Sequence, residues 1–102
     1  AYQSDATEAQ PSFEESKVRA FPNPVKPDYQ GYINIVGLMM DSQVKITDAY
    51  GSLIHEGTSV GGSFSWNGRD NKGRWVASGI YHVIATDERG KEGIVTKIVM
   101  IK

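Results

Sequence analysis

The stretch from Trp66 to Tyr81 constrains the fold most, because it joins two strand-like runs through a polar loop. It reads Trp-Asn-Gly-Arg-Asp-Asn-Lys-Gly-Arg-Trp-Val-Ala-Ser-Gly-Ile-Tyr. Gly adopts positive φ without steric cost, and Asn and Asp side chains bond to nearby backbone amides, so this composition favours tight turns. Phe64 and Trp66 alternate with serines before the loop. We therefore expect a strand, a loop held in one shape, and a second strand.

The same pattern recurs along the chain. Residues of alternating character, bounded by turn residues, are typical of strands with one buried face. Such runs are Lys17–Phe21, Gly31–Val36, Gln43–Asp48, Ser52–Glu56, Ser63–Trp66, Gly79–Thr86 and Ile94–Ile101. No stretch shows the period of a helix. The sequence therefore predicts an all-β fold, an immunoglobulin-like antiparallel β-sandwich with Greek-key connections and about seven strands, with Trp66 in the core.

The first sixteen residues differ from the rest in composition. They contain four acidic residues and only two large apolar ones, Tyr2 and Phe13. Such a segment buries too little surface to offset the entropy lost on ordering. We expect residues 1–16 to be a flexible acidic linker from a preceding domain, and residues 17–102 to form the immunoglobulin-like domain.

Charge and composition argue against several classes of function. Lys and Arg total 11 and Asp and Glu total 12, so we expect no nucleic-acid binding. There is no cysteine, which excludes disulfides and thiol nucleophiles. No apolar run is long enough to span a bilayer, so we expect no membrane insertion.

Several residues have structural interpretations as turn or packing positions. The Pro22-Asn23-Pro24 tripeptide is expected to form a stiff corner, because each proline fixes its own φ and restricts the residue before it. Asp48 and Gly51 are typical of a hairpin turn. At the start of the longest run, Gly79 is expected to permit close approach, and Tyr81 to fill the core while its hydroxyl finds a partner at the rim.

The last strand-like run raises a question of edge pairing. If residues 94–102 lie at a sheet edge, their unpaired amides and carbonyls could receive an added strand from a receptor. The same edge, or residues 18–21, could pair two copies of the chain into a weak homodimer.

No residue pattern indicates catalysis, a metal or a cofactor. His55 and His82 fall on outward or rim positions, and no second ligand follows at zinc spacing. Asn67, Asp70 and Asn71 lack the order of a calcium loop, because Arg69 interrupts them and no closing Glu follows. No serine, histidine and acid combination resembles a nucleophile elbow. We expect a protein that is not an enzyme.

Three segments in this order resemble the type A C-terminal sorting domains of the type IX secretion system of Bacteroidetes. They are Phe21-Pro-Asn-Pro24, Thr47-Asp-Ala-Tyr-Gly-Ser-Leu-Ile54 and Gly79-Ile-Tyr-His-Val83, and Lys97-Ile-Val-Met-Ile-Lys102 follows them. The longer form, with Gly61–Gly68 and Gly73–Tyr81, is most similar to domains that end large propeller-bearing surface proteins.

The resemblance implies a non-catalytic signal for export through the periplasm to the outer-membrane surface or the medium. The implied partners are the type IX translocon, its shuttle and attachment-complex proteins, and a surface sortase that cuts some family members. The positions that match the family motifs, and so would be read by the translocon, are Pro22, Asn23, Pro24, Asp48, Gly51, Gly79, Tyr81, Lys97, Ile98, Val99, Met100, Ile101 and Lys102.

Two alternatives stay open. Residues 66–81 also resemble the immunoglobulin-like module of flagellar hook-capping proteins, and Asn67 stands where Asp is common. A structural or ligand-binding module of a surface protein would instead hold neighbouring domains, or bind a glycan through Tyr29, Tyr32 or Trp75.

Overall fold

The structure is a computed structural model, which describes residues 17–86 and 89–102. The predicted linker, residues 1–16, lies outside them. The described residues form seven strands and no helix. They are β2 (Arg19–Phe21), β3 (Ile33–Val36), β4 (Gln43–Thr47), β5 (Leu53–Thr58), β6 (Ser63–Trp66), β7 (Gly79–Thr86) and β8 (Glu92–Met100).

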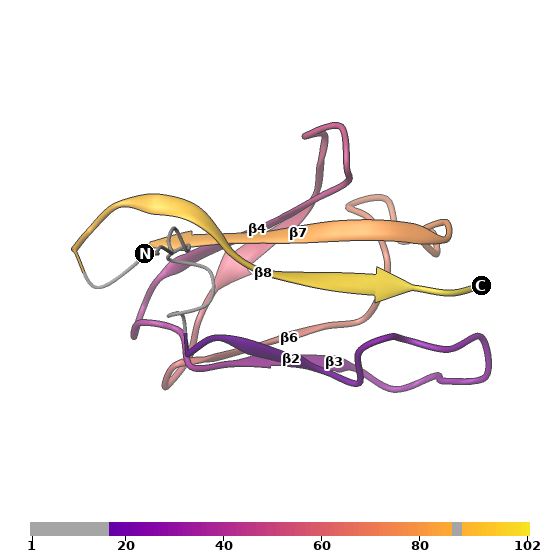
Figure 1. Cartoon of the computed structure of the whole chain (residues 1–102), viewed down its shortest axis with the longest axis horizontal. Coiled ribbons are helices and arrows are strands. Elements are labelled where there is room, and N and C mark those ends of the chain that lie inside the picture. Colours follow the sequence, from indigo (N-terminus) through magenta and orange to yellow (C-terminus); the bar gives the residue numbers. More distant parts are fainter. Residues whose placement is uncertain (1–16, 87–88) are drawn as a thin grey trace, which may run out of the picture.

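The strands form two antiparallel sheets that face each other (Figure 1). One sheet has the order β2-β3-β6, and the other has the order β5-β4-β7-β8. The chain crosses between the sheets after β3, after β5 and after β6, so hairpin neighbours alternate with crossovers as in a Greek key. This arrangement confirms the predicted β-sandwich. Among the described residues there is no helix of the length and hydropathy that a membrane span requires.

The core lies between the sheets and follows the predicted alternation. Trp66 is fully buried, and its ring centroid lies 5.8 Å from that of Tyr81. The predicted inward residues of the other strands are buried as well: Ile33, Ile35, Val44, Ile46, Tyr81, Val83 and Ala85. Phe64 is partly buried and packs against this core, because it lies on an edge strand.

One aromatic side chain packs between β5 and β6, which are outer strands of different sheets. Phe64 of β6 lies 5.8 Å, centroid to centroid, from the ring of His55 on β5. A Cβ at Gly57, also on β5, would collide with the same Phe64 ring. Glycine at this position therefore lets the two sheets approach each other at this edge.

The last strand differs from its predicted bounds. It begins at Glu92, two residues before the predicted Ile94, and ends at Met100. Opposite it, the register with β7 shifts between Val83 and Ile84. Alternation counted back from the buried Met100 and Ile98 would place Ile94 inward, but the extra residue of the bulge shifts the pattern, so Val95 is buried and Ile94 is exposed.

Candidate functional site

Most of the residues that matched the family motifs lie at one end of the four-stranded sheet. The pair Gly79↔Met100 places the start of β7 beside the end of β8. Because β4 runs antiparallel to β7, the turn that follows Thr47 lies at the same end. The segment between β2 and β3 also reaches this end, where β8 finishes (Figure 1).

The side chain of Asn23 bonds to the backbone of β8 on its outer side. Its Nδ2 donates to the carbonyl oxygen of Lys97 at 2.8 Å. The backbone N–H of Val99 donates to Asn23 Oδ1 at 3.0 Å. One side-chain amide thus fills the donor and acceptor positions that a neighbouring strand would fill.

The chain continues this pairing two residues later. The Val25 N–H donates to the carbonyl of Val99 at 2.7 Å, and the Ile101 N–H donates to the carbonyl of Val25 at 2.8 Å. The Val25 side chain is 2% exposed and belongs to the core. We call residues 22–25 the clamp segment, because they fasten the three-stranded sheet to the end of β8. The Phe21–Pro22 and Asn23–Pro24 peptide bonds are both cis.

The expectation of an unpaired edge at residues 94–102 is wrong for the part that the clamp segment covers. β8 is indeed an outer strand of its sheet. However, the outward backbone groups of Lys97, Val99 and Ile101 are bonded to the clamp segment. A receptor strand therefore has no free ladder along this half of β8 unless the clamp segment moves away.

The six terminal residues of the predicted recognition set divide by alternation. Ile98 and Met100 are buried in the core at 0% and 2% exposure. Val99 and Ile101 face solvent at 37% and 41%, and Lys97 and Lys102 are also exposed. The exposed residues, which alone offer side chains to a partner, are Lys97, Val99, Ile101 and Lys102.

Asp48 and Asp70 build two turns with the same hydrogen bonds. Asp48 Oδ1 accepts the N–H groups of Tyr50 and Ser52, both at 2.9 Å. The equivalent oxygen of Asp70 accepts the N–H groups of Lys72 and Arg74 at 2.9 Å and 3.0 Å. Each turn follows the sequence Asp-x-x-Gly, which confirms the predicted turn role of Asp48.

Both turns end on a glycine in the left-handed region. Gly51 has a φ of 88° and Gly73 a φ of 81°.

The backbone hydrogen bonds from Arg74 and Lys72 hold the pKa of Asp70 below its usual value, and the charges of these two residues act in the same direction.

Tyr81 has the packing role that was predicted for it. Its ring is 6% exposed beside Trp66, and its hydroxyl donates to the carbonyl of Ala77 at 2.7 Å. A tyrosine near the start of this strand that bonds to the backbone a few residues upstream is a known feature of immunoglobulin-like sandwiches. Burial raises the pKa of Tyr81, and the nearby charge of Asp48 adds to the shift.

The predicted role of Gly79 is wrong in its physical reason. No atom lies within 4 Å of the position that a Cβ would occupy there, so the glycine does not serve close approach. Its φ is 153°, a conformation that L side chains rarely adopt. Gly79 therefore sets the backbone at the entry to β7.

Three side chains at this end were not singled out together from the sequence. The guanidinium carbon of Arg69 lies 4.0 Å from the centroid of the Trp75 ring, and Nζ of Lys102 lies 4.2 Å from it. The Lys102 N–H also donates to Ser78 Oγ at 2.8 Å. Trp75 is 48% exposed. No sequence signal indicated this contact, because Lys102 is distant in sequence from Arg69 and Trp75.

The residues considered for metal binding make other contacts in the structure. Asn67 Oδ1 accepts the N–H of Arg69 at 3.0 Å, and Asp70 is bonded as above. His55 packs on Phe64, whereas His82 lies opposite Lys97 on the other face of the sheet. Within the described part of the chain, no three His, Cys, Asp or Glu side chains lie close enough together to hold a metal ion.

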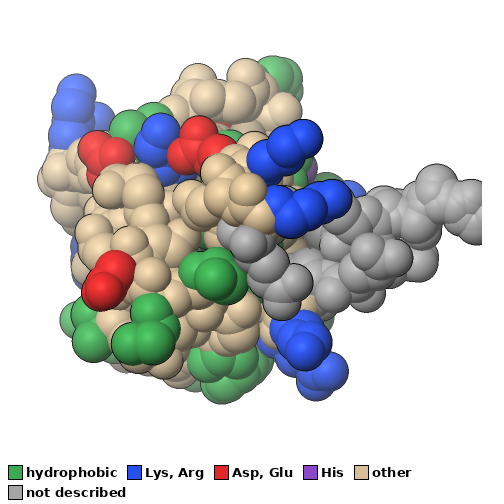
Figure 2. All heavy atoms as spheres, turned by 90° about the vertical axis from the view of Figure 1, so that its left-hand side faces the viewer, with side chains coloured by type: hydrophobic (Ala, Val, Ile, Leu, Met, Phe, Trp, Pro, Cys, Tyr) green, Lys and Arg blue, Asp and Glu red, His purple; other side chains and the backbone are tan. Residues whose placement is uncertain are grey.

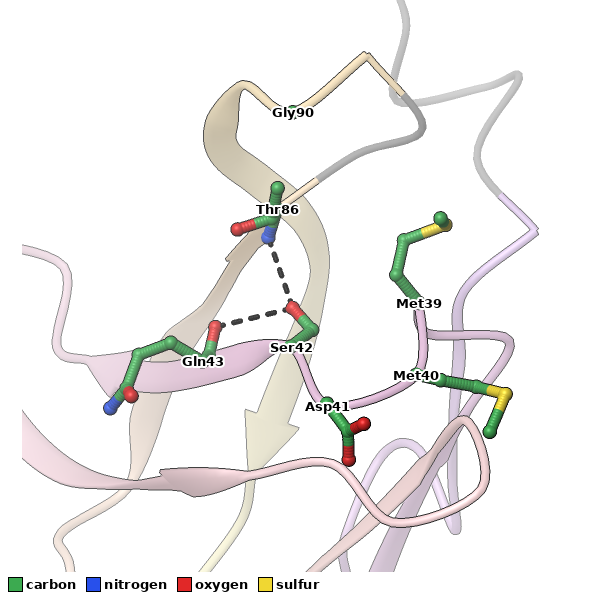
Figure 3. Close-up of a pocket in the computed structure, with 7 residues that line it drawn as sticks. All are labelled: Met39, Met40, Asp41, Ser42, Gln43, Thr86 and Gly90. Carbon is green, nitrogen blue, oxygen red and sulfur yellow. Dashed lines mark hydrogen bonds between the residues drawn. The ribbon is translucent and has the colours of Figure 1, made fainter.

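A hollow of about 310 Å³ lies at the opposite end of the four-stranded sheet, where β4 begins and β7 ends. The residues that line it are Met39, Met40, Asp41, Ser42, Gln43, Thr86 and Gly90 (Figure 3). The Ser42 hydroxyl lies between two backbone groups, accepting from Thr86 N–H at 3.3 Å and donating to the Gln43 carbonyl at 3.4 Å. Its polar group is thus used by the fold, and none of the residues predicted for recognition lies here.

Comparison with known proteins found one informative similarity. No family model matched, and no curated protein matched. Among solved structures, a chain matched with 36% identity and a TM-score of 0.75 over 87% of this chain. The chain is similar to part of PorZ. PorZ is an essential bacterial surface component of the type IX secretion system of the human oral bacterium Porphyromonas gingivalis.

The match to PorZ agrees with the resemblance inferred from the motifs. This chain covers 12% of the PorZ chain, so it corresponds to one domain of a much longer protein. The match covers nearly all of the described sandwich at an identity well above that of fold likeness alone. The type A assignment stays a prediction.

Proposed function

We propose that this chain is a non-catalytic sorting domain, whose folded surface is recognised by the outer-membrane machinery of the type IX secretion system. The observation that carries the proposal is the 36% identity to a segment of PorZ over 87% of this chain. In this proposal, the domain directs an attached cargo through the periplasm to the cell surface or the medium. Shuttle and attachment-complex proteins are its partners, and a surface sortase acts where the cargo is released.

The geometry of the clamp segment supports recognition of a folded shape. Asn23 and Val99 lie 76 positions apart in the chain, yet they share a hydrogen bond. The Phe21-Pro-Asn-Pro24 motif and the terminal strand therefore form one surface only after folding. A receptor that reads both motifs thus reads the folded state, which a linear peptide does not reproduce.

Pairing of an added strand is limited by the same geometry. The clamp segment covers residues 97–101, at the end of β8 and just after it, so contacts of side chains carry recognition at this end. Strand addition would take place on β5, the other outer strand of the four-stranded sheet, or on the part of β8 before Lys97.

A second candidate is a ligand-binding module of a surface protein. It is favoured by Trp75, which is 48% exposed with two cations near its ring. Tyr32 is 58% exposed, whereas the Tyr29 hydroxyl is bonded to the carbonyl of Tyr32 at 2.7 Å. In this alternative, Trp75→Ala abolishes ligand binding while export continues unchanged.

The proposed function is tested by export of a reporter. A periplasm-directed fluorescent protein is fused before residues 1–102 and expressed in a bacterium with a working type IX system. The control is the same reporter without the chain. We expect the fusion at the surface or in the medium and the control in the periplasm; a folded fusion that stays in the periplasm overturns the proposal.

A fusion that lacks residues 100–102 is a second variant, and it requires a folding measurement beside it. Met100 is 2% exposed in the core, and the Ile101 N–H bonds to Val25. Loss of these residues therefore weakens the sandwich as well as any recognition. Its export is interpreted only together with its melting temperature.

A further inference from the structure

The outer face of the four-stranded sheet carries exposed aliphatic side chains at the end held by the clamp segment. Ile80 of β7 pairs with Val99 of β8. Their neighbours Tyr81 and Ile98 are buried, so Ile80 and Val99 point to the solvent side. Ile101 follows Val99 on the same side of the alternation.

Leu53 joins these residues from β5. It lies opposite Thr47, and Thr47 lies opposite the outward-facing His82. We call Leu53, Ile80, Val99 and Ile101 the outer strip; their exposed fractions are 44%, 45%, 37% and 41%. Each is half exposed, although a β-branched or leucine side chain gains free energy by leaving water.

The charges around the outer strip are mainly positive. The segments 79–86 and 96–102 contain no Asp or Glu, and Lys97 lies on the same side of the alternation as Val99 and Ile101. Lys102 follows on the other side, with its Nζ over the Trp75 ring. The acid nearest along the chain to Leu53 is Glu56, which accepts from Gln43 Nε2 at 3.4 Å. The next is Asp48, and one oxygen of its carboxylate already accepts two backbone N–H groups. A partner that covers the strip thus meets the cation of Lys97 at its border.

The other half of the same face has a different balance. There, Lys45 pairs with Glu92 at 3.5 Å, and Gln43 bonds to Glu56 at 3.4 Å. At the end of the molecule away from the C-terminus, basic and acidic side chains lie next to one another (Figure 2). On the described part of this face, the clamped half thus combines exposed aliphatic side chains with a positive charge, whereas the charges of the other half are paired.

We propose that the outer strip is a docking surface for a protein of the type IX outer-membrane machinery, whose own surface is apolar at the centre and acidic at the border. This inference rests on the proposed function. Aliphatic side chains suit an apolar protein surface, whereas sugars are generally bound on aromatic rings. Opposite charge at the border guides association and fixes orientation.

A second copy of the chain fits this surface poorly. Two outer strips placed face to face would join two surfaces of the same sign, because segments 79–86 and 96–102 hold no Asp or Glu to pair with Lys97 of the other copy. Like charges in such an interface oppose association. The partner is therefore a different chain.

The test uses the reporter fusion with the full 102-residue chain. The strip variant is Ile80→Ser with Val99→Ser, and the matched control is Ile94→Ser. Ile94 lies on β8 with 46% exposure and at the other half of the face. We expect the strip variant to reduce surface reporter by about tenfold or more, as central contacts of an interface do, and the control to leave it unchanged.

Charge is tested separately with Lys97→Glu and Lys45→Glu on the same face. We expect the first to reduce export and the second to have little effect, because exposed ion pairs such as that of Lys45 stabilise weakly. Melting temperatures of all variants show whether each is folded.

Contact is tested with a photo-crosslinking amino acid at position 99 or 94 in the exported fusion. We expect position 99 to yield a crosslink to a type IX outer-membrane protein, identified by mass spectrometry, and position 94 to yield none. Crosslinks from position 99 only to a second copy, to the reporter or to lipopolysaccharide overturn the inference.

The two proposals fail in distinguishable ways. If the strip variant is folded and exported as well as the Ile94→Ser control, the outer strip is not a docking surface, and the sorting function stands. If the unmodified fusion itself remains in the periplasm, the sorting function fails, and the docking proposal fails with it.

Discussion

The side-chain oxygen of Asn23 accepts the backbone N–H of Val99, 76 positions later in the chain, at 3.0 Å. The same amide group donates to the carbonyl of Lys97. A corner between two prolines thereby completes the hydrogen bonding of an outer strand. This contact joins the two sheets at the end where the motif residues lie.

Replacement of Asn23 by Ala should destabilise the sandwich. Two hydrogen bonds are lost at an exposed edge where water can replace them, so we expect a loss of about 1–2 kcal/mol in the free energy of unfolding. Urea unfolding measures it, and the amide of Val99 should exchange its hydrogen faster. Asn71→Ala, in an exposed turn, is the control. Equal stability of the two variants would show that the Asn23 contact contributes nothing.

Replacement of Gly57 by Ala should destabilise more than the same change at Gly93. The added methyl at position 57 collides with the Phe64 ring, whereas no atom lies within 4 Å of a Cβ at position 93. Overpacking of this kind costs about 1–3 kcal/mol. Gly93→Ala should be neutral or slightly stabilising, because alanine loses less backbone entropy on folding. Thermal unfolding of both variants checks this, and a neutral Gly57→Ala would contradict the close packing of the two edge strands.

Tyr81→Phe removes the hydroxyl that donates to the carbonyl of Ala77. At neutral pH we expect a loss of about 1 kcal/mol, typical of one hydrogen bond. Burial raises the pKa of Tyr81 in the folded protein, so the folded state holds this proton more tightly than the unfolded state does.

The pH dependence of that difference has a definite sign. The stability contributed by the raised pKa is complete below the unfolded tyrosine pKa of about 10, and it is lost as pH rises through the folded value. The wild type should therefore lose stability above this pH more steeply than Tyr81→Phe. Parallel curves for the two proteins would refute the buried hydroxyl.

Asp70 gives the opposite dependence. The backbone N–H of Arg74 is the main cause of its lowered pKa. A lowered carboxyl pKa contributes stability above the unfolded value, about 3.9, and this contribution disappears as pH falls through the folded value. Asp70→Asn should thus be less stable than the wild type near pH 6, and the difference should shrink on acidification. Asn71→Ala, which changes no titrating group, should show a constant difference; the same constancy for Asp70→Asn would contradict the account.

Much of the fold could be predicted because its information is local. Alternation identified Val44 and Ile46 as buried, and turn chemistry identified the hairpin at Asp48. Trp66 and Tyr81 were recognised as core residues because large aromatic side chains at inward positions have few other places in a small sandwich.

The clamp segment could not be predicted, because its contacts join residues far apart in sequence. Nothing near Asn23 indicates that its amide meets Lys97, or that Val25 covers the edge of β8. The role of Gly79 was also missed, since glycine is required there by a φ of 153° and not by a close neighbouring side chain. The outer strip required the register of β7 with β8, which alternation alone does not supply.

The most direct measurement of the sorting function is the surface fraction of the fused reporter in two otherwise identical strains, one with and one without a working type IX system. The account predicts surface or released reporter in the first strain and periplasmic reporter in the second. Equal distribution in both strains, with the domain folded in each, would contradict it.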